Sequence, residues 1–143
     1  MTTKAVSFAL AGFATISLWH SVVVASQART VWDGVYTAAQ AKRAEPLYQE
    51  KCSKCHAPDL TGKDAPPIVG AEFSGNWNDL SVNDLFERIR VGMPDDDKGS
   101  LKRNEVADIV ALILQKAGMP VGKEELPTEG AVLREIKYLG VKP

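Results

Sequence analysis

The sequence predicts a single all-α domain of about three to four helices. Apolar side chains recur at helical spacing in the stretches 37–51, 81–92 and 103–117, and no segment alternates convincingly as a strand. A chain of 143 residues has room for one domain once an N-terminal targeting segment is set aside. The net charge of −1, without any basic tract, gives no sign of a nucleic-acid partner.

The first helix is predicted from about residue 37 to residue 51. Thr37 is a suitable N-cap, because its hydroxyl can accept a hydrogen bond from a free backbone N–H of the first turn. Residues at helical spacing give the helix one apolar face, formed by Ala41, Ala44, Leu47 and Tyr48. Pro46 lies inside this stretch and removes a backbone donor. The helix is therefore either kinked at Pro46 or restarts with Pro46 in its first turn.

Two later helices have clearer boundaries. Ser81 and Asp84 have the spacing of a capping box and begin a helix that Gly92 and Pro94 end. Its apolar face consists of Val82, Leu85, Phe86 and Ile89. The strongest helical pattern runs from about residue 103 to 117 and stops before a Gly and a Pro. Its apolar stripe consists of Val106, Ile109, Val110, Ile113 and Leu114.

The remaining segments have weaker signals. Residues 57–75 are rich in Pro and Gly and predict an ordered loop. A loop of this length is unusual in a compact domain unless a functional group packs against it. We expect a main domain over residues 29–122 and a C-terminal extension over 123–143, with a weak helical signal around 131–139.

Residues 1–28 have the order of a secretory signal peptide. Lys4 precedes an apolar run over residues 5–18, and small residues before Ala28 fit cleavage after that position. This predicts a periplasmic protein. An uncleaved membrane anchor is the main alternative and would be the only reason for membrane contact, although His20 and several Ser and Thr interrupt the apolar character. A buried helix is the third possibility.

Both cysteines of the chain lie in one pentapeptide, residues 52–56, which reads Cys-Ser-Lys-Cys-His. The pattern Cys-x-x-Cys-His is the attachment signature of c-type haem, in which the two thiols bond to two haem vinyl groups and the His binds the iron. A thioredoxin-like redox pair belongs near a βαβ pattern, which is absent here. A structural zinc site normally needs four ligands, and the chain has no third cysteine to supply one. A plain disulfide leaves His56 without a role. The sequence therefore predicts one haem c, attached through Cys52 and Cys55 with His56 as an axial ligand.

The second axial ligand is predicted to be Met93. Electron-transfer cytochromes c commonly place Met opposite His, which raises the reduction potential. Met93 and Met119 both occur in a Gly-Met-Pro triplet, but Met93 lies in the loop between the two later helices. Met119 follows the last strong helix, where a packing role is expected. An open sixth position is the remaining alternative.

With these residues in place, the chain resembles the class I c-type cytochromes over about residues 36–122 of its length. The resemblance rests on the order of an N-terminal helix, the pentapeptide and four further parts, namely residues 65–70, the aromatic pair Phe73 and Trp77, residues 91–94, and the helix at 105–110. It implies a cytochrome c-like fold packed around one covalently bound haem. Residues 31–36 and 84–90 are also similar to small cytochromes associated with bacterial periplasmic quinoprotein dehydrogenases.

The resemblance also implies two roles near the haem. The Pro66 carbonyl should accept a hydrogen bond from His56 and fix the imidazole ring, with Pro67 as the alternative acceptor. Trp77 should pack at the haem edge and donate its indole N–H to a propionate, although an ordinary core aromatic is an equally good interpretation from the residue alone.

The function predicted from the sequence is single-electron transfer in the periplasm, without catalysis of its own. The implied partners are redox proteins, with a periplasmic dehydrogenase as donor and a terminal oxidase or another cytochrome as acceptor. Two other functions are open: a haem-bearing subunit of a dehydrogenase complex, and a haem enzyme with a displaceable sixth ligand. The state of Met93 distinguishes the enzyme from the carrier.

Overall fold

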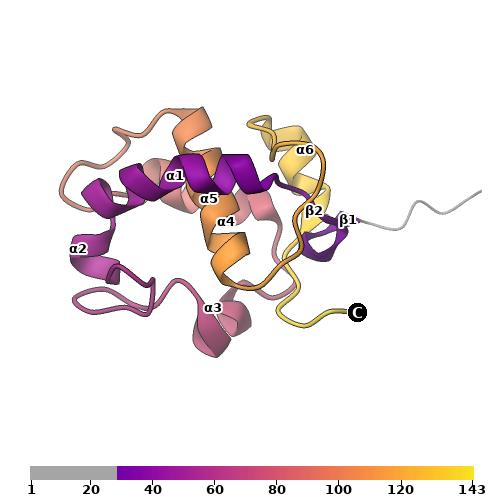
Figure 1. Cartoon of the computed structure of the whole chain (residues 1–143), viewed down its shortest axis with the longest axis horizontal. Helices are drawn as coiled ribbons and strands as arrows, with labels where there is room; N and C mark the ends of the chain where they lie inside the picture. Colours follow the sequence, from indigo (N-terminus) through magenta and orange to yellow (C-terminus); the bar gives the residue numbers. More distant parts are fainter. Residues whose placement is uncertain (1–28) are drawn as a thin grey trace, which may run out of the picture.

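The computed structural model describes residues 29–143 and confirms an all-α architecture (Figure 1). The three long helices predicted from periodicity are present as α1 (Ala38–Lys51), α4 (Val82–Gly92) and α5 (Arg103–Lys116). Three shorter helices are α2 (Ser53–His56), α3 (Gly70–Trp77) and α6 (Gly130–Arg134). The chain also forms a 3-10 turn, η1 (Val31–Asp33), and two short strands, β1 (Arg29–Thr30) and β2 (Ile136–Lys137).

The predicted signal segment, residues 1–28, lies outside the described residues. Within residues 29–143, no helix combines the length and apolar character needed to cross a membrane.

The central helix of the core is α5, against which α1 and α4 both pack. Every residue from Val106 to Leu114 is buried, as expected for a helix enclosed on all sides. Asp108 is the charged member of this run, and both of its carboxylate oxygens accept hydrogen bonds from Arg43 of α1 at 2.8 Å. Arg43 also binds Glu125 through two bonds of 2.9 Å. One guanidinium therefore joins α1, α5 and the C-terminal segment.

The first helix begins as predicted and continues through its proline. The Thr37 hydroxyl accepts a hydrogen bond from the backbone N–H of Gln40 at 3.1 Å. Pro46 is exposed and lies inside a single helix that runs from Ala38 to Lys51, so the helix does not restart there. The face opposite Pro46 carries the buried Ala44 and Tyr48, which pack toward the core.

The capping box at the start of α4 is present as predicted. The Ser81 hydroxyl accepts a bond from the Asp84 N–H at 3.3 Å, and the Ser81 N–H donates to the Asp84 carboxylate at 2.9 Å. At the other end, the N–H of Met93 caps the helix by donating to the Ile89 carbonyl at 2.9 Å.

The prediction of an ordered loop over residues 57–75 is wrong for its last third, because α3 begins at Gly70. Gly70 has a φ of 87°, which allows the sharp turn into the helix. Phe73 and Trp77 stand four residues apart and so share one face of α3. Glycines at both 70 and 75 concealed this helix, because Gly is read as a helix breaker.

The C-terminal segment packs into the same core as the rest of the domain. The weak helical signal around 131–139 corresponds to α6, followed by β2 rather than by more helix. The sequence indicated no strand, yet β2 pairs in parallel with β1, with Arg29 opposite Ile136. The apolar side chains of this segment fill the core next to α1 and α4, and the buried ones are Leu126, Leu133, Ile136 and Tyr138.

The lead-in before α1 closes against the start of the C-terminal segment. The N–H of Gly122 donates to the Tyr36 carbonyl at 2.7 Å, and the Tyr36 hydroxyl donates to the Met119 carbonyl at 2.7 Å. A Cβ on Gly122 would lie 1.8 Å from the carbonyl oxygen of Gly34, so only glycine allows this approach. Gly34 itself has a φ of 65°.

Candidate functional site

The Cys-x-x-Cys-His pentapeptide lies where α1 ends and α2 begins. The N–H of Cys52 donates to the Tyr48 carbonyl at 2.9 Å and ends α1. The carbonyl of Cys52 then accepts bonds from the N–H groups of Cys55, at 3.2 Å, and His56, at 3.0 Å. Residues three apart on a helical turn lie on one side of it, so both thiols are presented together. Both cysteines are half-buried and neither forms a disulfide.

The electrostatics of Cys52 do not suit a redox dithiol. Burial, with a smaller contribution from the neighbouring Cys55, raises the pKa of the Cys52 thiol to about 11. Redox-active Cys-x-x-Cys pairs have instead a lowered thiol pKa, because the thiolate is the reactive form. The thioredoxin-like interpretation therefore loses support on the chemistry of the site as well as on the fold.

The imidazole of His56 is held in one tautomer. Its Nδ1–H donates to the carbonyl of Pro66 at 2.8 Å, since a carbonyl can only accept. The other nitrogen, Nε2, therefore carries the free lone pair that a metal requires. This is the His56–Pro66 hydrogen bond that the family resemblance implied, and Pro66 rather than Pro67 is the acceptor.

The loop that carries Pro66 folds back onto the pentapeptide. The N–H groups of Asp64 and Ala65 donate to the Cys55 carbonyl at 3.1 and 3.0 Å, and the Gly62 N–H donates to the His56 carbonyl at 3.0 Å. A Cβ on Gly62 would lie 2.7 Å from the Pro67 nitrogen, so the turn requires glycine there. The loop thus fixes the orientation of the His56 ring.

Tyr48 ties the start of this loop to α1. Its hydroxyl donates to the Ala57 carbonyl at 2.7 Å, and its ring is buried. The sequence indicated only a core position for Tyr48, because the polar contact depends on how residues 57–69 fold back.

The two candidate methionines occupy different surroundings. Met93 is half-buried at the C-terminal end of α4. Met119 is only 4% exposed and belongs to the hydrophobic core, in keeping with the packing role expected for it. Trp77 is half-buried on α3, with its ring tilted against Phe73 at a centroid distance of 5.9 Å. Within residues 29–143, its indole N–H has no protein acceptor.

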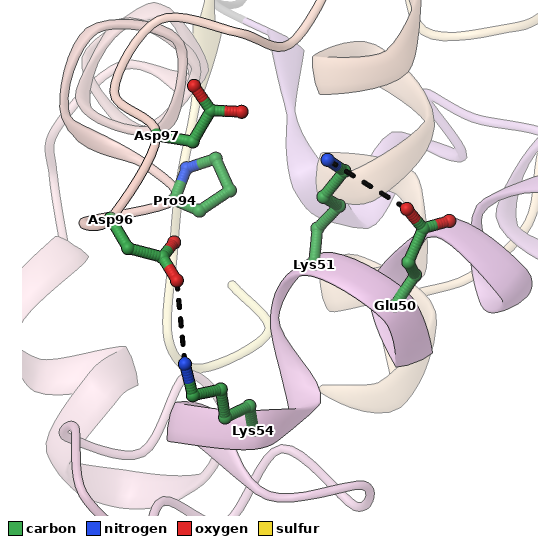
Figure 2. Close-up of a pocket in the computed structure, with 6 residues that line it drawn as sticks. All are labelled: Glu50, Lys51, Lys54, Pro94, Asp96 and Asp97. Carbon is green, nitrogen blue, oxygen red and sulfur yellow. Dashed lines mark ion pairs between the residues drawn. The ribbon is translucent and has the colours of Figure 1, made fainter.

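A cavity of about 370 Å³ separates the pentapeptide from the loop that follows Met93 (Figure 2). Lys54, between the two cysteines, reaches from one side, and Pro94 and Asp96 line the other. An ion pair of 3.5 Å between the Lys54 ammonium and the Asp96 carboxylate crosses the gap. Both side chains are more than two-thirds exposed, so this pair adds little stability. The ion pair does show that the pentapeptide and the loop after Met93 lie on opposite sides of the same cavity.

The residues at this place fit a haem. The pentapeptide offers two neighbouring free thiols and an imidazole with a free Nε2, and the thioether of Met93 is half-buried beside Pro94. None of these four side chains lines the cavity itself, whose lining is mostly charged. Several apolar side chains remain partly exposed at the edge of the core, namely Ile68, Val69, Trp77 and Ile89. Among residues 29–143, no three His, Cys, Asp or Glu side chains gather to hold a bare metal ion.

The fold and this attachment motif define a c-type cytochrome domain, and comparisons with known proteins agree. Residues 39–113, just over half of the chain, match the family described as cytochrome c oxidase, cbb3-type, subunit III. The chain is also similar to cytochrome c-551 of Bacillus subtilis (strain 168), with 32% identity over 83 residues, 58% of this chain and 70% of the relative. No solved structure matches the chain significantly.

The chain therefore belongs to the class I c-type cytochromes. Members of this family are electron-transfer proteins, so the chain is a haem-containing electron carrier. It also implies a covalently bound haem c and redox partner proteins, and it is consistent with a protein that works outside the cytoplasm or at a membrane.

Proposed function

We propose that the chain is a periplasmic carrier of single electrons that holds one haem c through Cys52 and Cys55, with His56 and Met93 as axial ligands. The hydrogen bond from His56 Nδ1 to the Pro66 carbonyl carries this proposal, because it leaves Nε2 free to bind a metal in the same pentapeptide as two free thiols. The haem, when bound, supplies an iron that alternates between the ferrous and ferric states.

The protein's own residues set how readily that iron accepts an electron. The Pro66 carbonyl makes the imidazole of His56 a stronger donor, which favours the ferric state. The thioether of Met93 favours the ferrous state, and Met opposite His raises the reduction potential. Two axial protein ligands leave no open position for a substrate, so the proposed role is transfer rather than catalysis.

The position of Met93 supports its assignment as the sixth ligand over Met119. Its neighbour Pro94 lines the same cavity as Lys54 of the attachment motif. The side chain of Met93 is half-buried and remains available, whereas Met119 is already enclosed by the core.

The proposed partners are a periplasmic dehydrogenase as donor and a terminal oxidase or another cytochrome as acceptor. This rests on the predicted signal segment at residues 1–28 and on the similarity of residues 31–36 and 84–90 to cytochromes of quinoprotein dehydrogenase systems. Export predicts a mature chain that begins near Arg29, with its soluble domain in the periplasm. Mass spectrometry of periplasmic protein measures that end directly, and an intact chain found only in membranes would contradict it.

The decisive experiment compares Met93→Ala with Met119→Ala in holoprotein produced with haem-attachment machinery. Wild-type ferric protein should be low-spin and show the weak near-infrared band of Met–iron ligation. Met93→Ala should lose the band, lower the reduction potential and open the iron to carbon monoxide. Met119→Ala should keep the band and lose only stability, by about 2–5 kcal/mol for a buried Met. Loss of the band in Met119→Ala alone would reverse the assignment.

The covalent attachment is tested separately from the axial ligands. Acidified organic solvent should leave the haem on the wild-type protein. Replacement of Cys52 or Cys55 by Ala leaves at most one thioether and should sharply reduce the yield of holoprotein. Haem that is extracted freely from the wild type would overturn the role of both cysteines. A high-spin wild type that binds carbon monoxide rapidly would instead favour a haem enzyme with a displaceable sixth ligand.

A further inference from the structure

Tyr138, near the end of the C-terminal segment, makes side-chain contacts with α3. Its ring is fully buried and meets Phe73 edge-on, with ring centroids 5.9 Å apart and planes at 85°. Its hydroxyl forms a hydrogen bond of 3.2 Å with the Ser74 hydroxyl. Phe73 in turn lies against Trp77, with centroids 5.9 Å apart. The three rings form a continuous chain of contacts from the C-terminal segment to the half-buried indole.

The backbone around Tyr138 holds the turn that follows α3. The Tyr138 N–H donates to the Leu80 carbonyl at 2.8 Å, and its carbonyl accepts from the Asp79 N–H at 2.9 Å. Gly140 adds a bond of 2.9 Å from its N–H to the Asn78 side chain. Asp79 has a φ of 64°, a conformation that a non-glycine residue adopts only when its surroundings hold it there. The hydrogen bonds from Tyr138 and Gly140 to residues 78–80 hold Asp79 in this conformation.

Little else fixes α3. The helix packs only sparsely against the other helices and strands of residues 29–143, and it stands apart from the group formed by α1, α4 and α5 (Figure 1). Val69, the N-cap residue just before the helix, provides no side-chain cap. An eight-residue helix is too short to be stable on its own, so its position depends on tertiary contacts. Tyr138 supplies contacts to both the body of α3 and its exit.

We propose that Tyr138 is a positioning residue that holds α3, and with it Trp77, against the haem and so limits the access of water to the haem edge. This rests on the proposed function and on the expectation from the family resemblance that Trp77 packs at that edge. Exposure to solvent is one of the properties that set the potential of a metal centre. Water stabilises the more highly charged ferric state, so release of α3 lowers the reduction potential.

The test variant is Tyr138→Leu, which keeps an apolar side chain and every backbone bond but removes the ring contact and the hydroxyl. The matched control is Leu133→Ala, which opens a cavity at a fully buried position of α6 in the same C-terminal segment. Leu133→Ala should be the less stable variant. A merely structural role for Tyr138 would therefore give Leu133→Ala the larger change in potential.

The expected result is the opposite order. The redox equilibrium of Tyr138→Leu with a mediator dye should shift by about threefold toward the ferric protein, which corresponds to a potential lower by about 28 mV. Leu133→Ala should show no measurable shift. Amide hydrogen exchange within α3 should be about tenfold faster in Tyr138→Leu and unchanged in Leu133→Ala. Tyr138→Phe, which keeps the ring, should retain the wild-type potential.

Equal potentials in wild type, Tyr138→Leu and Leu133→Ala, with unchanged exchange in α3, would overturn the positioning role while leaving the carrier function intact. A wild-type protein without covalent haem or without Met ligation would refute the proposed function itself. Because those observations are made on the wild type alone, the two failures are distinguishable.

Discussion

Gln40 connects α1 to the C-terminal segment through two buried hydrogen bonds. Its side-chain amide N–H donates to the Leu126 carbonyl at 3.1 Å, and its amide oxygen accepts from the Leu126 N–H at 2.7 Å. Gln40 and Leu126 are each only 2% exposed. Gln40→Ala leaves two buried backbone groups without partners, at about 1–3 kcal/mol for each. We therefore expect the free energy of unfolding to fall by about 2–6 kcal/mol, with the upper value reached only if Leu126 stays buried.

Denaturant unfolding of the holoprotein, followed by far-ultraviolet circular dichroism, measures this loss. The melting temperature should fall by roughly 3–6 °C for each kcal/mol. Gln49→Ala is the control, because Gln49 lies in the same helix but is exposed and donates one bond of 3.3 Å to Pro58. Its cost should stay within about 0.5 kcal/mol. Equal, small losses in both variants would refute the idea that the buried amide anchors the segment.

Three further outcomes follow from packing and charge. Gly122→Ala should destabilise the domain by about 1–3 kcal/mol, because its Cβ would lie 1.8 Å from the Gly34 carbonyl oxygen. Gly75→Ala is the control and should not destabilise the domain, because the space around Gly75 is open. Thermal unfolding compares the two variants. Arg43→Met should lower the midpoint of chemical denaturation, because it leaves the buried Asp108 carboxylate without its partner, and an unchanged midpoint would be inconsistent with that burial. Hydrogen bonds from Arg43 hold the pKa of Glu125 below its ordinary 4.5. The stabilisation of the folded state by this pair is therefore present at neutral pH and is lost as the pH falls through the lowered pKa. The free energy of unfolding, measured across that pH range, should fall less steeply in Arg43→Met than in the wild type.

The parts of the fold that the sequence predicted are those determined by near neighbours. The apolar faces of α4 and α5 follow a helical period within the helix itself, and the box formed by Ser81 and Asp84 spans four residues. The attachment motif is equally local, since five consecutive residues carry both thiols and the imidazole. Such patterns need no knowledge of distant contacts.

The parts that could not be predicted depend on residues far apart in the chain. No local sequence pattern marks Gln40, and its buried hydrogen bonds form only because Leu126 lies next to it in the fold. Two-residue strands are too short for any alternation to appear. The position of α3 depends on Tyr138, 64 residues beyond Ser74. At the site, the Lys54–Asp96 contact joins two exposed side chains whose meeting no local signal indicates.

The pairing of β1 with β2 also determines the order in which the domain can be completed. Arg29 pairs with Ile136, so the backbone groups at the start of the domain cannot be paired until the C-terminal segment has reached its place. The Trp32 indole N–H has the same dependence, because its acceptor is the Leu139 carbonyl at 2.9 Å. Contacts of such long sequence separation form late and slow the folding of a small domain. The local turn of the attachment motif at residues 52–56 can therefore form before the lead-in closes against the C-terminal segment, while the cysteines are still accessible.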